Sequence, residues 1–245
     1  MKLDRIGHGY IFTGPRGVGK TTVARVLAKV LNCKNPKEND PCNDCTHCEE
    51  ITNGRNMDVL ELDGASNRGI DEIRELRESV KYPPNSGEYR VYIIDEVHML
   101  TKEAFNALLK TLEEPPPHVV FIFATTELYK MPETIISRTQ RYDFRRLSID
   151  DILNRMKFIL KEETIEFDEE SLLKIADKAD GSMRDALSIL DQMICICDNN
   201  ITINQVNTSL GIIDDENYFK ILSLVSSRNT KDLLKSFNEI ISYGV

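Results

Sequence analysis

Long apolar segments and a secretion signal are both missing from this 245-residue chain. Its longest clear apolar run, Val119–Ala124, is far too short to cross a bilayer. The first residues, Met1–Arg5, lack the apolar core of a signal peptide. Internal repeats and low-complexity segments are missing as well. We therefore expect a globular cytoplasmic protein that has no membrane partner.

An excess of basic residues is also missing. Lys plus Arg total 31 and Asp plus Glu total 40, so the net charge is −9. A protein that embraces DNA alone over a wide surface is normally basic. The charge balance therefore argues against an autonomous DNA-binding domain, and any DNA contact must use a local patch or a surface shared with partner subunits. The apolar fraction of 41% is ordinary for a globular protein with a real core.

Short apolar runs alternate with segments of helical periodicity in the first half of the chain. The predicted strands are Tyr10–Thr13, Val59–Leu62, Val91–Ile94 and Val119–Ala124, and the predicted helices are Thr22–Leu31, Ile70–Val80 and Thr101–Leu112. Strands this continuously apolar are buried on both faces, as in a parallel sheet flanked by helices. The pattern predicts a doubly wound α/β domain with three layers.

The pattern changes after about residue 147, where helical segments follow one another with no strand signal between them. These segments predict a small helical bundle. Cys195 and Cys197 lie in an apolar part of it and are expected to be core residues. The chain stops without an obvious closing element, which suggests a piece of a longer protein. The predicted helices are Asp150–Glu163, Asp168–Ala179, Ser182–Cys195, Ile203–Leu210, Glu216–Val225 and Thr230–Tyr243.

Residues Gly14–Thr21 read G-x-x-x-x-G-K-T and lie between a predicted strand and a predicted helix, as a P-loop requires. Its glycines let successive N–H groups converge on one anion. Lys20 would reach the β- and γ-phosphates, and the Thr21 hydroxyl would bind Mg²⁺. The alternative is a chance match in an ordinary Gly-rich loop. The residues expected to bind nucleotide are Gly14, Pro15, Arg16, Gly17, Val18, Gly19, Lys20, Thr21, Thr22 and Asp95.

Two carboxylates, Asp95 and Glu96, end the third apolar run. In P-loop enzymes an acid at this strand end holds Mg²⁺ beside the phosphate loop, so Asp95 is predicted to lie next to the Lys20 turn. Glu96 fits the general base that polarises a water for attack on the γ-phosphate. Acids that merely solvate a strand end are the alternative. Together with the P-loop, the pair favours ATP hydrolysis over simple nucleotide storage.

Four cysteines form the pattern C-x8-C-x2-C-x2-C in a loop rich in Asn, Pro and charge. They are Cys33, Cys42, Cys45 and Cys48. Such spacing suits tetrahedral zinc–thiolate coordination, whereas disulfides are disfavoured in a cytoplasmic chain. An Fe–S cluster is the rival metal centre. His47 is expected to point away from the metal. Because four protein ligands close a zinc site, we predict a structural zinc.

Three further polar residues stand where an ATPase needs them. Thr125 closes the fourth apolar run, which would bring its hydroxyl near the γ-phosphate. Arg138 follows the last core segment, and Arg184 begins a predicted helix. On the alternative interpretation each is an ordinary surface residue, as a lone arginine usually is.

The chain resembles the gamma/tau clamp-loader ATPases of bacterial DNA polymerase III, which belong to the AAA+ family. The resemblance covers residues 6–210, and the cysteine insertion after the P-loop helix makes it specific. It implies a P-loop AAA+ domain over residues 1–147 with a zinc insertion at about 33–48, a helical lid over 148–210, and the start of a collar domain over 211–245. The matching segments are Gly14–Thr22, the four cysteines, Asp63–Asn67, Val91–Leu100 (VYIIDEVHML), Ala107–Pro116, Ala124–Glu127, Ser137-Arg138 and Gly181–Ser188.

The resemblance also implies roles for the polar residues. Thr125 resembles the sensor-1 residue that reads the γ-phosphate, and Arg184 the sensor-2 arginine of the lid. Arg138 resembles the arginine finger supplied to a neighbouring subunit's ATP, which is worth on the order of 10³-fold or more in rate. ATP binding would assemble a pentameric ring with other clamp-loader subunits that opens the sliding clamp, and primer-template DNA would trigger hydrolysis.

Three departures from the family pattern set further expectations. Members usually carry a few dozen residues before the position of Met1, including a segment that packs on the adenine. Their collar domain extends beyond Val245, and they commonly have Cys where this chain has Thr139. We expect the chain to fold, to bind ATP weakly and to stay largely monomeric.

The favoured function is an ATPase subunit that uses ATP binding and hydrolysis to load the sliding clamp onto primed DNA during replication. A non-hydrolysing scaffold subunit that keeps nucleotide as a structural ligand is the second hypothesis, and the intact Lys20, Asp95 and Glu96 argue against it. A zinc-dependent nucleic-acid-binding module is the third, weakened by the acidic charge.

Overall fold

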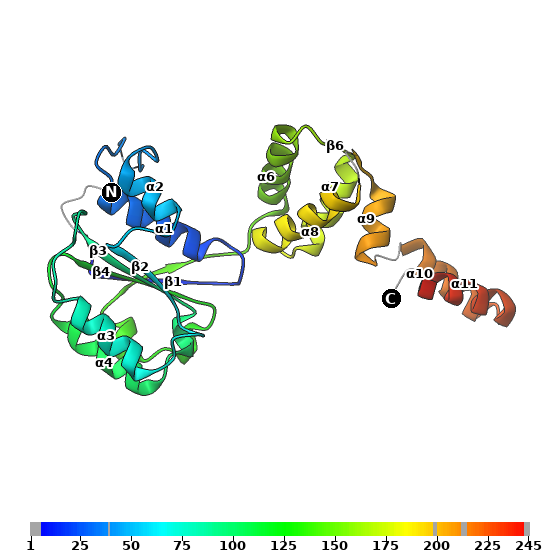
Figure 1. Ribbon diagram of the computed structural model, residues 1–245. Helices are drawn as coiled ribbons and strands as arrows, with labels where there is room; N and C mark the ends of the chain where they lie inside the picture. Colours follow the sequence, from blue (N-terminus) through cyan, green and yellow to red (C-terminus); the bar gives the residue numbers. More distant parts are fainter. Residues whose placement is uncertain (1–5, 39, 198–199, 212–214, 243–245) are drawn as a thin grey trace. The chain divides into compact units, whose positions relative to one another are not determined.

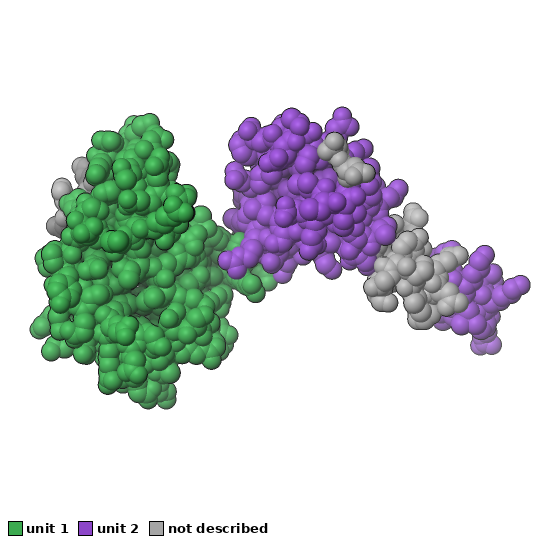
Figure 2. Space-filling view, in the orientation of Figure 1, with its two compact units in different colours: residues 1–146 green, residues 147–245 purple. Residues whose placement is uncertain are grey.

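The computed structural model describes residues 6–38, 40–197, 200–211 and 215–242. The chain divides into two compact units, Met1–Arg146 and Leu147–Val245, drawn in different colours in Figure 2. Among the residues that the structure describes, no helix combines the length and the apolarity needed to span a bilayer.

The first unit is built on a five-stranded parallel sheet with strand order β2-β3-β4-β1-β5. The four apolar runs form strands as predicted, and a fifth strand joins them at the edge beside β1. Its strands are β1 (Gly9–Thr13), β2 (Val59–Asp63), β3 (Arg90–Asp95), β4 (Val119–Thr125) and β5 (Gln140–Asp143). Its helices are α1 (Lys20–Asn32), α2 (Thr46–Thr52), α3 (Ile70–Ser79), α4 (Lys102–Glu113) and α5 (Glu133–Ile136), with one-turn 3₁₀ helices η2 (Val97–Met99) and η3 (Leu128–Lys130).

Helices cover both faces of this sheet, with α1 and α2 on one side and α3 and α4 on the other (Figure 1). Successive side chains of a strand point to opposite faces, so each central strand feeds two cores. Val91 and Ile93 of β3 belong to the core with α1, whereas Tyr92 and Ile94 belong to the core with α3 and α4. The predicted three-layer α/β architecture is confirmed.

The two edge strands differ from the prediction. The expectation that all the apolar runs are buried on both faces was wrong for β2, which is only half-buried because it is an edge strand. Glu61 of β2 faces solvent and accepts two hydrogen bonds from Arg25 of α1, at 2.7 and 2.6 Å. All four residues of β5 are exposed, so this strand carries no apolar signal and the sequence pattern missed it.

The second unit is helical, as predicted. Its helices are α6 (Ile149–Glu162), α7 (Glu169–Lys178), α8 (Met183–Ile196), α9 (Ile203–Leu210), α10 (Asp215–Ser226) and α11 (Thr230–Ser242). Each of the first four contributes one apolar face to a common core, as an amphipathic helix must. The hydroxyls of Ser148 and Ser182 accept backbone N–H groups in the first turns of α6 and α8, which fixes where these helices begin.

Two details of the second unit correct the sequence analysis. The expected absence of strands was wrong, because the two-residue strands β6 (Glu166–Phe167) and β7 (Asn200–Ile201) pair in parallel and bring Ile201 into the core. Cys197 is buried as predicted, but Cys195 is exposed. The two thiols differ because Cys195 lies on the solvent side of α8, whereas Cys197 packs in the core at its C-terminal end.

Candidate nucleotide site and zinc centre

The loop between β1 and α1 has the backbone shape that only glycine permits. Gly14 has φ +147°, and a Cβ built there would lie 2.2 Å from the carbonyl oxygen of Phe144, so no side chain fits. Gly19 precedes α1 with φ 94° in the left-handed region. Helix α1 then begins at Lys20, and the N–H groups of its first turn face the loop, an arrangement that favours an anion.

Lys20 and Thr21 connect this loop to the tip of β3. The Lys20 side chain is buried, and its Nζ donates to the carbonyl oxygens of Gly14 at 2.9 Å and Pro15 at 2.7 Å. The Thr21 Oγ1 donates to Asp95 Oδ2 at 2.7 Å. The predicted meeting of the Lys20 turn and the Asp95 strand end is therefore present, across 74 residues of sequence.

The sheet order explains why these distant segments meet. All five strands are parallel, so their carboxyl ends share one edge. In open α/β sheets, ligands bind outside these carboxyl ends, at the point where the strand order reverses. Here β1 lies beside β4, and β3 follows next. The N–H of Gly14 bonds the carbonyl of Thr125 at 3.2 Å, which joins the P-loop to the end of β4.

Glu96 sits directly after β3 with a strained backbone, at φ 44° and ψ 43° in the left-handed region. This kink turns its side chain toward the end of β4. There Glu96 Oε2 accepts a hydrogen bond from the Thr126 hydroxyl at 3.1 Å and lies 3.4 Å from the Thr126 N–H. The candidate general base is therefore held by Thr126.

His98 and Glu127 complete the group around Thr125. The Thr125 side chain is fully buried, and its hydroxyl lies 3.0 Å from His98 Nδ1 and accepts the Glu127 N–H at 3.0 Å. The sequence analysis missed Thr126, His98 and Glu127 as site residues. They fall within the matching segments Val91–Leu100 and Ala124–Glu127, but nothing in the spacing shows that the two segments meet.

The remaining P-loop residues have different exposures. Val18 is buried and anchors the loop, whereas Pro15, Arg16 and Thr22 are exposed. Arg184 lies in the second unit, exposed on the first turn of α8.

Arg138 follows α5, and its side chain bonds residues of α5 and α4. Its guanidinium donates to the Thr134 carbonyl at 2.8 Å and to Glu113 Oε1 at 2.9 Å. Its side chain remains 35% exposed, so it is accessible from outside the chain. Thr139, where the family commonly has Cys, donates its hydroxyl to the carbonyls of Ile135 and Ile136.

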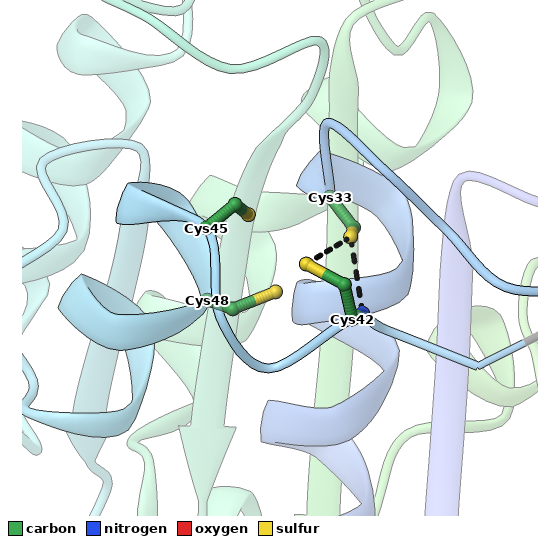
Figure 3. Close-up of side chains that lie close together, drawn as sticks. All are labelled: Cys33, Cys42, Cys45 and Cys48. Carbon is green, nitrogen blue, oxygen red and sulfur yellow. Dashed lines mark hydrogen bonds between the residues drawn. The ribbon is translucent and has the colours of Figure 1, made fainter.

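The four cysteines converge at the other end of α1 (Figure 3). All four Sγ atoms lie within 4.8 Å of one another, and the Sγ atoms of Cys33 and Cys42 are 3.4 Å apart. Ligands about 2.3 Å from a tetrahedral zinc stand about 3.8 Å apart, so the cluster needs little adjustment to take the ion. Cys33 ends α1 and Cys45 precedes α2. Cys48 lies in the first turn of α2, where the sequence predicts a loop.

The pKa values of two cysteines in this cluster move in opposite directions. Burial raises the pKa of the Cys45 thiol, but hydrogen bonds from the N–H groups of Lys34 and Cys48 outweigh burial and bring that pKa down to about 6. Burial and the contact with Cys45 raise the pKa of Cys48 to about 12. His47 is buried and turns its Nδ1 to the Asn32 carbonyl at 2.9 Å, so it lies outside the group of ligand atoms.

Two family models match the chain in succession. Residues 1–148 match the model described as DNA polymerase III, delta subunit, and residues 151–199 match the ATPase lid domain of the DNA polymerase III clamp loader subunit. Curated relatives at 42–48% identity are named as the gamma or tau subunit of DNA polymerase III. The chain belongs to the DNA polymerase III gamma/tau family.

Curated relatives of this family match the chain along its whole length. The DNA polymerase III subunit tau of Bacillus subtilis is 48% identical over 98% of the chain and 43% of its own length. The gamma subunit of Buchnera aphidicola is 44% identical over 100% of the chain and 68% of its own length. The tau subunit of Escherichia coli is 42% identical over 100% of the chain, which spans only 38% of that relative.

Solved structures confirm the fold. The RuvB Holliday junction branch migration motor of Thermotoga maritima superposes with a TM-score of 0.59 at 17% identity, over 91% of this chain and 70% of that one. A DNA polymerase III gamma-subunit-related protein of the same organism gives a TM-score of 0.51 at 21% identity, over 97% and 74%. The chain therefore has the AAA+ P-loop ATPase fold followed by a helical lid domain.

Proposed function

We propose that this chain is the nucleotide-binding part of a clamp-loader subunit that binds and hydrolyses ATP to load a sliding clamp onto primed DNA. The observation that carries the proposal is the 2.7 Å hydrogen bond between Thr21 and Asp95, which joins a glycine-built phosphate loop to an acidic strand end. Residues 148–210 would serve as the lid and residues 211–245 would begin the collar.

The P-loop would bind the triphosphate through its backbone and Lys20. The Lys20 ammonium now bonds two loop carbonyls, and a phosphate would offer it charged oxygens instead, which make stronger hydrogen bonds. The Thr21 hydroxyl and the Asp95 carboxylate are hard oxygen donors, the ligands that Mg²⁺ prefers. When bound, Mg²⁺ would neutralise charge that develops on the phosphates.

Glu96 would accept a proton from the attacking water. The hydrogen bond from the Thr126 hydroxyl goes to Oε2 of the carboxylate, so the other oxygen, Oε1, could accept that proton while Thr126 holds the side chain. Thr125 would hold the γ-phosphate from the end of β4. Arg184 would serve as the sensor-2 arginine of the lid.

Arg138 would act on a neighbouring subunit. Its contacts with Glu113 and Thr134 orient a partly exposed guanidinium, as a residue supplied in trans requires. The likeness to clamp-loader subunits supports the proposed partners, which are other clamp-loader subunits, the clamp and primer-template DNA. The four thiols would hold a structural zinc, since four protein ligands leave no open position for catalysis.

The test compares phosphate release by the full-length protein and by its Glu96→Gln variant, with clamp, primed DNA and partner subunits present. The carboxamide has nearly the same shape but is a far weaker base, so we expect a rate lower by a factor on the order of 10² with ATP binding retained. Equal rates would favour the non-hydrolysing scaffold.

A further inference from the structure

A buried histidine lies between the two candidate catalytic side chains of this site. The His98 side chain is only 7% exposed. Its Nδ1 is 3.0 Å from Thr125 Oγ1 and 3.4 Å from Glu96 Oε2, and its Nε2 is 3.7 Å from Glu127 Oε2. One ring nitrogen therefore faces both the candidate sensor and the candidate base.

We propose that His98 is a positioning residue that couples Thr125 to Glu96, so that a phosphate bound at Thr125 sets the position of the base. This inference rests on the proposed ATPase function. It assigns the coupling to the Nδ1 side of the ring, because Nε2 faces neither side chain.

The hydrogen-bond inventory of Thr125 supports this coupling. The hydroxyl already accepts the N–H of Glu127, and it has a single proton to donate. That proton goes either to His98 Nδ1 or to a phosphate oxygen. When it goes to phosphate, the contact with His98 persists only if the ring carries its own proton on Nδ1. In that tautomer Nδ1–H also points a donor toward Glu96 Oε2, which competes with the Thr126 hydroxyl for the carboxylate.

The local structure keeps these groups within reach of one another. His98 lies in η2, which starts immediately after the kinked Glu96, so ring and carboxylate belong to one short turn. Thr125, Thr126 and Glu127 are consecutive at the end of β4. A small shift in either segment therefore changes both contacts of the ring, and a misplacement of about 1 Å in a site costs on the order of 10²-fold in rate.

Three substitutions at position 98 distinguish the role of Nδ1 from that of Nε2. His98→Asn places an amide near the position of Nδ1 and can either donate or accept there. His98→Gln places its amide near Nε2, and His98→Phe keeps a ring without hydrogen bonds. His118→Phe is the matched control, because His118 is partly buried and its Nε2 bonds the carbonyls of Val80 and Tyr82, away from this site.

The measurements are ATP affinity, single-turnover hydrolysis and thermal stability of the full-length protein in its assembly. We expect His98→Phe to lower the hydrolysis rate on the order of 10- to 100-fold while ATP affinity stays within about 3-fold. His98→Asn should recover most of the rate and His98→Gln little of it. His118→Phe should lose stability only.

Coupling through Thr125 is tested by a double-mutant cycle. In a Thr125→Val background, His98→Phe should cost much less than it does alone, because the contact is already lost. Additive losses in the double mutant would overturn the proposal. A His98→Phe variant that hydrolyses ATP at the wild-type rate would also overturn it, and so would equal hydrolysis rates in His98→Asn and His98→Gln. A wild-type protein that binds ATP but never hydrolyses it would instead refute the proposed function.

Discussion

The two ends of helix α1 carry the two candidate sites of the first unit, and they are built in opposite ways. At the N-terminal end, the loop before Lys20 is shaped by glycines, and its partners Asp95, Glu96 and Thr125 come from two distant strands. At the C-terminal end, four thiols from only 16 residues converge on one point.

The two candidate sites therefore depend on the fold to different degrees. The cysteine cluster is a local arrangement, because Cys33 ends α1 and the other three cysteines follow within one loop and one short helix. The nucleotide site exists only once β1, β3 and β4 are paired, since its polar residues stand at their carboxyl ends. Changes at one end of α1 should therefore leave the other largely intact.

Lys20→Ala should disable the N-terminal end of α1 more strongly than any other substitution considered below. Removing the ammonium takes away the charge that would meet the β- and γ-phosphates, so we expect hydrolysis to fall on the order of 10³-fold or more. Zinc content, measured by atomic absorption, should stay unchanged. Loss of zinc in this variant would contradict the independence of the two ends.

Cys48→Ser should abolish metal binding at the C-terminal end of α1. Serine is a poor zinc ligand, so metal content should drop to near background and the free energy of unfolding should fall by about 3 kcal/mol or more. Cys195→Ser, which changes an exposed thiol outside the cluster, is the control and should retain both. ATP affinity should change less than about 3-fold. If chelating the zinc abolished ATP binding, the two ends would be one cooperative site.

Asp58→Asn should lower the stability of the first unit, because Asp58 holds the loop that contains Asn85, Ser86 and Gly87. The Asp58 carboxylate is buried and accepts the N–H groups of Asn85, Ser86 and Gly87 at 2.6, 2.8 and 2.8 Å. We expect a loss of about 2 kcal/mol at neutral pH, because hydrogen bonds to a charged acceptor are replaced by weaker ones. Chemical denaturation measures it.

The same substitution has a defined pH dependence. Burial raises the pKa of Asp58, but the three N–H groups outweigh burial and hold the pKa below its usual value. A lowered pKa in the folded state contributes stability that is complete above the unfolded value of about 3.9 and is lost as the pH falls through the folded one. The difference between wild type and Asp58→Asn should therefore be constant from pH 7 to about 5 and shrink below about 4. A difference that grew on acidification would refute this assignment.

His47→Phe should have the smallest effect. His47 bonds the Asn32 carbonyl, so its loss leaves one buried acceptor without that donor and costs about 1 to 2 kcal/mol. Zinc stoichiometry should be unaffected. A drop in bound zinc would show that the histidine is a ligand after all.

Sequence reasoning worked best where one local pattern contains the whole signal. The apolar runs of β1, β3 and β4 predicted central strands because strands buried on both faces must be apolar throughout. It missed β5, whose residues are all exposed, and it misjudged β2, because an edge position lets Glu61 face solvent. An exposed edge strand forms because it pairs with a neighbouring strand, so its own residues need not be apolar and give no sequence signal.

The amino-acid sequence alone determined the family, the phosphate loop, the acidic strand end and the thiol set, because each is a short run of residues with its own chemistry. Only the tertiary structure decided that Thr126 holds Glu96 and that His98 lies between Glu96 and Thr125. Those contacts join segments about 30 residues apart, and they depend on the pairing of β3 with β4 and on a left-handed kink at Glu96, which no local pattern encodes.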